Sequence, residues 1–256
     1  MRQIKAEKFK KAGFTLASFA IIVGVWWLLA ETSFKQSGIV PNPIKTLVIV
    51  GREMQKATFA AAIFSTLYRS FVSFLISFAA AVVFAMAANF LKCIDIMLKP
   101  FIAICRSMPT IVLVLILWIV LGSALLPIVV GFLVVFPMCY ENMYTAIAET
   151  DKKLIAMANV FKVPKFRQVT GIYLPAMLPY VFASLIAGFG LNIKVLISAE
   201  VLAKPAMSIG LMIQLANSAG ALDAAFAWLV IAVVLSLLCE GVLKGARRLC
   251  LPYGKV

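Results

Sequence analysis

The sequence contains no histidine, and its five cysteines include no Cys-x-x-Cys pair. The side chains from which zinc sites and dithiol redox sites are usually built are therefore missing. The chain also has no Gly-x-x-x-x-Gly-Lys-Ser/Thr motif, the loop that cradles nucleotide phosphates. We therefore expect no catalytic site, no metal site and no cofactor bound by this chain.

Charged residues are scarce as well, at 13% against 64% hydrophobic residues in a chain of 256. A soluble domain of this length has too little interior to bury so much apolar surface, so we expect an all-α integral membrane protein. The net charge is +14. Because the cations lie at the edges of apolar runs, as topology signals do, we expect membrane lipid as a partner and no nucleic acid.

Apolar windows of about twenty residues predict six membrane-spanning helices in one transmembrane domain. The windows lie near 14–31, 65–90, 105–121, 125–143, 176–197 and 224–243. The first window follows a basic head, but it is too long for a signal peptide and lacks a small-residue cleavage site, so we expect it to be retained. Only Gly122 and Ser123 separate the third window from the fourth, which predicts a tight hairpin.

The distribution of lysine and arginine predicts the orientation of these helices. With the N-terminus inside, the cytoplasmic segments hold 17 of these residues and the opposite segments hold 5, while Arg69 and Lys194 lie within or near spans. This asymmetry predicts that both ends of the chain are cytoplasmic. An even number of crossings is then required, in agreement with six.

The second window carries small residues at four-residue spacing, namely Ser73, Ser77, Ala81 and Ala85. Such a stripe lets another helix backbone approach closely. Two interpretations are open: a contact that lines a pathway or a dimer interface, and ordinary packing within the chain.

A polar and basic cytoplasmic loop, residues 148–175, forms an insertion that separates the fourth and fifth windows. Residues 151–163 contain no glycine or proline, and four apolar residues share one helical face: Leu154, Ile155, Ala158 and Phe161. Asp151 can cap this helix and Pro164 ends it. The amphipathic helix suits the groove of a soluble partner, or it lies on the lipid surface.

The insertion resembles the cytoplasmic loop of ABC importer permeases, whose pattern is E-A-A, a later glycine, and I-x-L-P. The matching run is 155–162, and it closes on Ile172-Tyr173-Leu174-Pro175. This chain has Ala156 in place of the usual Glu, Met157 in place of the middle Ala, and Lys162 in place of the Gly. Motifs in the order seen in nitrate/sulfonate/taurine-type permeases extend the resemblance: Val40–Pro43, Thr66–Phe71, Arg106–Pro109, Leu178–Tyr180, Ala199–Glu200 and Ser208–Leu211.

The resemblance implies a type I permease with six helices and a cytoplasmic coupling helix in the cell (inner) membrane. It implies a permease homodimer, separate ABC ATPase subunits that bind ATP, and an extracytoplasmic solute-binding protein. The imported solute would be a small anion such as nitrate, an alkanesulfonate or taurine, or a cofactor precursor. The residues that would couple the chain to the ATPase are Asp151, Leu154, Ile155, Ala158, Phe161, Lys162 and Pro164. The resemblance also implies that 198–223 folds partly back into the outer mouth and contacts the binding protein; the alternative is a plain surface loop.

Charged groups inside spans are candidates for the solute pathway. We expect such roles for Arg69, Asn192, Lys194 and Glu200. A purely structural role is the alternative for Arg69 and for Lys194. Lys194 lies near the outer end of its window and can extend its ammonium group to the interface. The alternative function is a secondary transporter or a channel subunit without an ATPase; a secondary transporter would be expected to contain a repeat between its halves, and none is visible.

Overall fold

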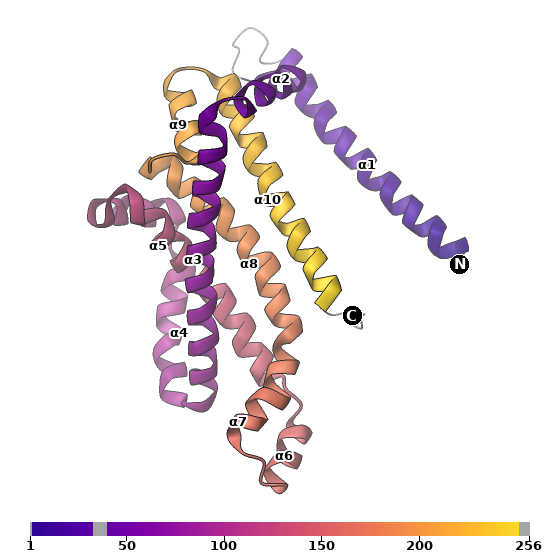
Figure 1. Ribbon diagram of the computed structural model, residues 1–256, viewed down its shortest axis with the longest axis vertical. Helices are drawn as coiled ribbons and strands as arrows, with labels where there is room; N and C mark the ends of the chain where they lie inside the picture. Colours follow the sequence, from indigo (N-terminus) through magenta and orange to yellow (C-terminus); the bar gives the residue numbers. More distant parts are fainter. Residues whose placement is uncertain (1, 33–39, 251–256) are drawn as a thin grey trace. The chain divides into compact units, whose positions relative to one another are not determined.

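The computed structural model describes residues 2–32 and 40–250, and every regular element in these two stretches is helical (Figure 1). The all-α fold predicted from the composition is therefore confirmed. In chain order the elements are α1 (Arg2–Glu31), α2 (Pro43–Met54), α3 (Ala57–Phe90), α4 (Lys92–Ser107), α5 (Thr110–Ala148), α6 (Lys152–Val160), α7 (Lys165–Gln168), a π-helical turn (Val169–Tyr173), α8 (Leu174–Ala203), α9 (Ile209–Ser218) and α10 (Leu222–Cys250).

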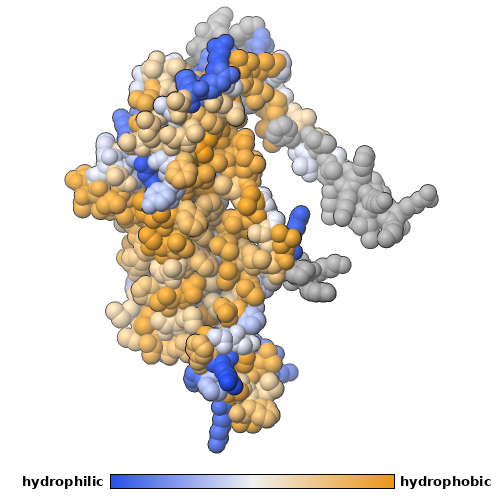
Figure 2. Space-filling model, viewed as in Figure 1, coloured by the Kyte–Doolittle hydropathy of each residue, from blue (hydrophilic) through white to orange (hydrophobic). Residues whose placement is uncertain are grey.

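Five helical segments within the described residues are long and apolar enough to cross a membrane. They are Gly13–Glu31, Ala57–Phe90, Thr110–Ala148, Lys165–Ala203 and Leu222–Cys250. Two of the six predicted windows, the third and the fourth, lie mostly within the single segment α5. The structure adds a helix of 16 residues, α4, which the windows did not predict and which returns alongside α3 (Figure 1). Apolar side chains cover much of the outward surface over α3 and α4, as contact with lipid requires (Figure 2).

The third window differs most from the structure. Residues 105–121 are not one helix, because α4 ends at Ser107 and α5 begins at Thr110. Pro109 causes the break: the residue before a proline is pushed into extended conformation, and Met108 has ψ 125°. A hydropathy window does not detect this helix break, because Met108 and Pro109 are both uncharged.

Gly122 divides α5 into two helical stretches, at the position where the sequence predicts a change of direction. Its φ of 66° and ψ of −177° lie in a region that only glycine occupies readily. The helix then continues to Ala148 through Pro127 and Pro137.

The chain divides into two compact units. The first comprises 1–59 and 212–231, and the second comprises 60–211 and 232–256. In the first unit, the indole of Trp26 in α1 donates to the carbonyl of Pro41 (3.1 Å) and stacks on Phe226. Lys45 of α2 forms an ion pair with Asp223 at the start of α10.

The core of the second unit is built by α3, α4, α5 and α8. Its largest cluster includes Phe74, Ile102, Phe136, Tyr140 and Met177. The four small residues of α3 lie within this unit and are fully buried: Ser73, Ser77, Ala81 and Ala85. The small stripe therefore serves packing within the chain, the second of the two interpretations.

Candidate functional site

The segment between α5 and α8 forms a tightly braced loop at one end of that helix pair (Figure 1). The carboxylate of Asp151 accepts from the backbone N–H of Lys153 at 2.8 Å, so it caps α6 as the sequence predicts. The helix covers 152–160 and is shorter than the predicted 151–163. Gln168 of α7 is buried, and its amide nitrogen donates to Asn159 Oδ1 (3.1 Å) and to the carbonyl of Val163 (2.9 Å). These bonds close the loop on itself and hold α6 against α7.

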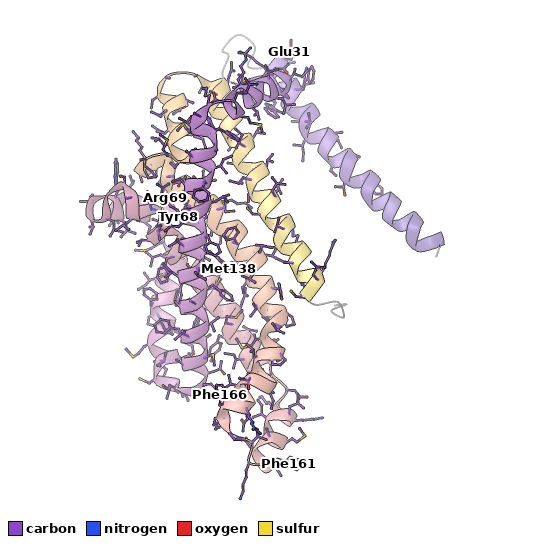
Figure 3. All side chains as sticks on the ribbon, in the orientation of Figure 1. Glu31, Tyr68, Arg69, Met138, Phe161 and Phe166 are labelled. Atoms are coloured by element: carbon purple, nitrogen blue, oxygen red, sulfur yellow. The ribbon has the colours of Figure 1, made fainter. Side chains whose placement is uncertain are left out.

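The loop presents apolar side chains outward. Phe161 is 75% exposed and Phe166 is 78% exposed, and Figure 3 shows both at the far end of the molecule. The other exposed members of this apolar surface are Leu154, Met157 and Val160. Ala158, by contrast, is buried. The four apolar residues assigned to one face therefore divide: Leu154 and Phe161 point outward, while Ala158 and the half-buried Ile155 anchor the helix.

Lys162 ends the helix in left-handed conformation, with φ 52°. A residue with a Cβ atom loses about 1–2 kcal/mol in this conformation, whereas glycine does not. The family pattern has glycine where this chain has Lys162, and the backbone conformation of Lys162 is one that favours glycine. Pro164 follows as the N-cap of α7, so the chain leaves α6 through a fixed turn.

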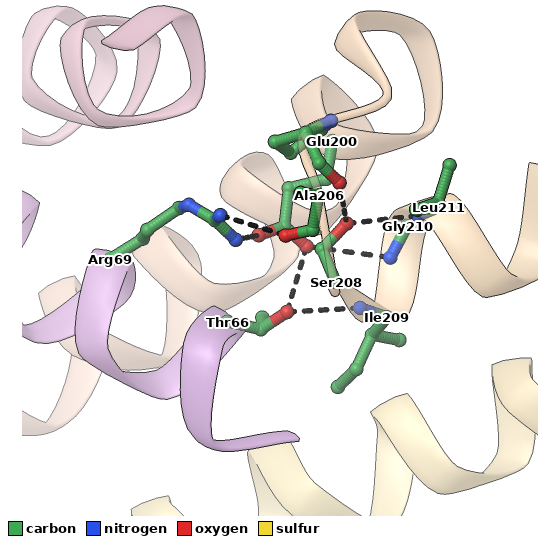
Figure 4. A network of polar contacts seen from close by, with 9 residues as sticks. Thr66, Arg69, Glu200, Ala206, Ser208, Ile209, Gly210 and Leu211 are labelled. Atoms are coloured by element: carbon green, nitrogen blue, oxygen red, sulfur yellow. Dashed lines mark hydrogen bonds and ion pairs between the residues drawn. The ribbon is translucent and has the colours of Figure 1, made fainter. Parts of the chain in front are cut away.

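A second polar cluster lies where α8 ends and the chain turns toward α9 (Figure 4). Glu200 is fully buried and accepts from Thr66 Oγ1 (2.9 Å), from Arg69 Nη1 (3.2 Å) and from the backbone N–H of Gly210 (3.4 Å). Arg69 also donates to the carbonyl of Ala206 at 3.0 Å. Thr66 accepts from the N–H of Ile209 at 3.0 Å.

These contacts, termed here the Glu200 cluster, join three segments that are far apart in the sequence. Two residues of α3 and one of α8 hold the turn 204–211 by its backbone groups. Buried charges are tolerated only when they are paired and hydrogen-bonded, and both conditions are met here. The cluster thus fastens the turn after α8 to α3.

The remaining two pathway candidates have opposite surroundings. Asn192 is fully buried; its amide nitrogen donates to the carbonyl of Ser70 (2.7 Å), and its oxygen lies 3.3 Å from Ser73 Oγ. Lys194 is exposed and stands in the wall of a cavity on α8. Of the four candidates, three are engaged in contacts between helices, and Lys194 faces open space.

Comparison with known proteins places this architecture in one family. Residues 77–244 match the family described as binding-protein-dependent transport system inner membrane component. The matched residues include α4, α5, the insertion, α8, the second part of α3 and most of α10. The chain belongs to this family.

Relatives of this permease cover nearly its whole length. It is 22% identical over 240 residues to a protein named as an aliphatic sulfonates transport permease, SsuC, of Bacillus subtilis, a match that covers 91% of this chain and 85% of the relative. It is 21% identical over 254 residues to the taurine transport system permease protein TauC of Escherichia coli, covering 95% and 90%. The resemblance identified from motifs is therefore confirmed.

Solved structures show the same fold at lower identity. A chain of a bacterial alginate ABC transporter, in complex with its pentasaccharide-bound periplasmic protein, aligns with a TM-score of 0.63 at 18% identity, over 94% of the permease and 96% of that chain. A chain of the MetNI methionine ABC transporter in an inward-facing conformation aligns with a TM-score of 0.63 at 16% identity, over 75% and 95%. Both comparisons support the type I permease fold.

Sequence reasoning did not assign roles to two residues that organise these sites. Thr66 lies three residues before Arg69 and so on the same face of α3, a spacing that could have linked it to the cluster. Gln168 is the one glutamine of a strongly basic loop, and nothing in the local pattern distinguishes it. The structure also pairs Glu200 with Arg69, a contact that the sequence analysis did not predict.

Proposed function

We propose that this chain is the permease subunit of an ATP-driven, binding-protein-dependent importer of a small anionic solute. Two copies of the chain would combine with two ABC ATPase subunits, which bind the ATP, and with an extracytoplasmic solute-binding protein. The family membership supports transport through the membrane. The sulfonate and taurine transport named for two relatives supports an anionic or sulfonate-like solute.

The observation that carries the ATPase contact is the exposed apolar surface of the loop between α5 and α8. Leu154, Met157, Val160, Phe161 and Phe166 are all exposed at its end. An isolated loop would gain nothing by exposing two phenylalanines, whereas a groove in a soluble partner can bury them. The excess of lysine and arginine in this segment supports its placement in the cytoplasm, where the ATPase would lie.

The seven proposed coupling residues have different tasks in this scheme. Leu154 and Phe161 would enter the ATPase groove. Asp151, Lys162 and Pro164 define the two ends of the helix. Ile155 and Ala158 hold it against the rest of the loop, so that it transmits force without bending.

Alternating access then follows as a shift between two states. Closure of the ATPase pair on ATP would draw the two α6 helices together and change the relative population of inward-open and outward-open forms. Because α7, the π-helical turn and α8 are continuous from Lys165 to Ala203, a displacement of the loop is passed directly to α8.

The proposal is tested by Phe161→Asp in a tagged permease co-expressed with its ATPase. The exposed side chain makes no core contact, so we expect normal amounts of permease in the membrane but loss of ATPase co-purification and of uptake. Phe161→Leu keeps an apolar contact and serves as the matched control. Unchanged co-purification in Phe161→Asp would contradict the proposed docking surface, and an unmodified chain that never retains an ATPase would favour a secondary transporter or channel.

A further inference from the structure

A cavity of about 500 Å³ lies between α8 and the beginning of α5. Its wall contains the ammonium-bearing side chain of Lys194, the hydroxyl groups of Thr110 and Ser198, and apolar side chains that include Ile111, Val114 and Leu202. All of these residues belong to the second compact unit. The volume is within the range of pockets that hold small molecules.

The charge of Lys194 is not neutralised within the described part of the chain. None of the ion pairs formed there includes Lys194, whereas the other intramembrane cation, Arg69, is paired with Glu200. Ser198, one helical turn further on, uses its hydroxyl hydrogen to bond the carbonyl of Lys194 (2.9 Å). Its oxygen remains able to accept.

The position of Lys194 along α8 argues against contact with lipid chains. It stands about 14 Å of helix rise before Ala203, the last residue of α8, at 1.5 Å per residue. An unpaired ammonium group is costly wherever hydrocarbon surrounds it, so a lysine within a membrane-spanning helix normally faces a water-filled path. The cavity beside it offers that path.

The composition of the wall indicates the chemistry of an occupant. One ammonium group and two hydroxyls suit a single compact anionic group, such as a sulfonate or carboxylate. The aliphatic residues beside them suit a short carbon chain. Thr110 and Ile111 are also the first residues of α5, whose backbone N–H groups lack partners within the helix and add to the positive potential.

We infer that the Lys194 cavity is a solute-binding station on the transport path, selective for small monoanions that carry a short apolar chain. This inference rests on the proposed importer function, since the solute must pass the cavity. Lys194 is then the specificity-determining residue, which attracts the anion, and the aliphatic wall holds its carbon chain.

Thiol labelling tests the inference without requiring ATP hydrolysis. In the whole transporter reconstituted in neutral phosphatidylcholine discs, Cys93, Cys239 and Cys250 are changed to serine and Ser198→Cys is introduced. Two methanethiosulfonate reagents of similar size are compared, one carrying a sulfonate and the other a quaternary ammonium group. Leu237→Cys on α10, at an outward-facing apolar position, provides the rate expected at the lipid surface.

We expect the anionic reagent to label Ser198→Cys about tenfold faster than the cationic one, because a unit charge one helical turn away biases the local concentration of ions. Adding Lys194→Gln should remove this preference, and Lys194→Arg should keep it. Millimolar butanesulfonate should slow the labelling several-fold, and only when a cation is present at position 194. The neutral discs contain no anionic lipid, so protection by butanesulfonate identifies a soluble anion as the ligand.

Three results would overturn the inference: labelling of Ser198→Cys no faster than Leu237→Cys, equal rates for the two reagents, or protection unchanged by Lys194→Gln. Replacing neutral lipid by phosphatidylglycerol should not reproduce the protection; if it does and butanesulfonate does not, the cavity holds a lipid headgroup instead. Absence of the ATPase from the purified complex would contradict the proposed function, whereas the labelling pattern reports on the cavity alone.

Discussion

Breaking the buried ion pair between Arg69 and Glu200 should strongly lower the free energy of unfolding of the permease. The Arg69 side chain is 15% exposed and that of Glu200 is fully buried, with 3.2 Å between Nη1 and Oε1. Arg69→Met removes the cation and leaves the carboxylate without its counter-charge. Thr66 and the N–H of Gly210 still bond that carboxylate, but neither carries a charge.

The expected loss in the free energy of unfolding depends on the burial of the Glu200 carboxylate, which Arg69→Met leaves without a counter-charge. Removing one member of a buried ion pair typically costs about 3–5 kcal/mol, most of it from the stranded charge. Glu200→Gln keeps an oxygen for Thr66 and Gly210, so it should cost less, about 2 kcal/mol. In the double variant no charge is stranded. Its cost should therefore fall short of the sum of the single costs by about 2 kcal/mol.

A double-mutant cycle measured by unfolding the purified permease in mixed detergent checks this expectation. The matched control is the pair Lys244–Glu240 in α10, which has a similar separation of 3.0 Å but side chains that are 56% and 23% exposed. Its coupling energy should be below about 1 kcal/mol, because solvent screens exposed pairs. Equal coupling energies in the two cycles would refute the claim that burial determines the strength of the Arg69–Glu200 pair.

Three further variants probe the backbone and the loop. Lys162→Gly should raise the free energy of unfolding of the permease by about 1 kcal/mol, because glycine adopts the left-handed conformation without strain; a lower melting temperature than that of the unmodified chain would contradict strain at Lys162. Gly210→Ala should destabilise by about 1–3 kcal/mol or more, since the new Cβ would lie 2.6 Å from the backbone carbon of Glu200, while Gly241→Ala, with open space around it, should have little effect in the same melting assay. Gln168→Leu should cost about 1–3 kcal/mol and increase proteolysis of the loop, and resistance equal to that of the unmodified chain would show that its two hydrogen bonds are dispensable.

The sequence was sufficient for the class of protein and for most of the helices. Hydropathy depends on local composition, so the long apolar runs that became α3, α8 and α10 are readable as membrane helices without any tertiary information. The cap at Asp151 and the break at Gly122 were predictable for the same reason, since both depend on neighbouring backbone geometry. The family could also be identified, because its motifs occur in a constant order.

Other features were decided only by the tertiary structure, because they depend on residues distant in the sequence. Glu200 meets Arg69 across 131 positions, and no periodicity within either helix indicates that pairing. The same holds for Lys194. Only the packing of α5 beside α8 shows that its ammonium group lines a cavity, while Arg69, Asn192 and Glu200 bond to other helices. Local sequence determines which segments are helical and apolar, whereas the packing of those helices decides which charges are paired and which remain unpaired.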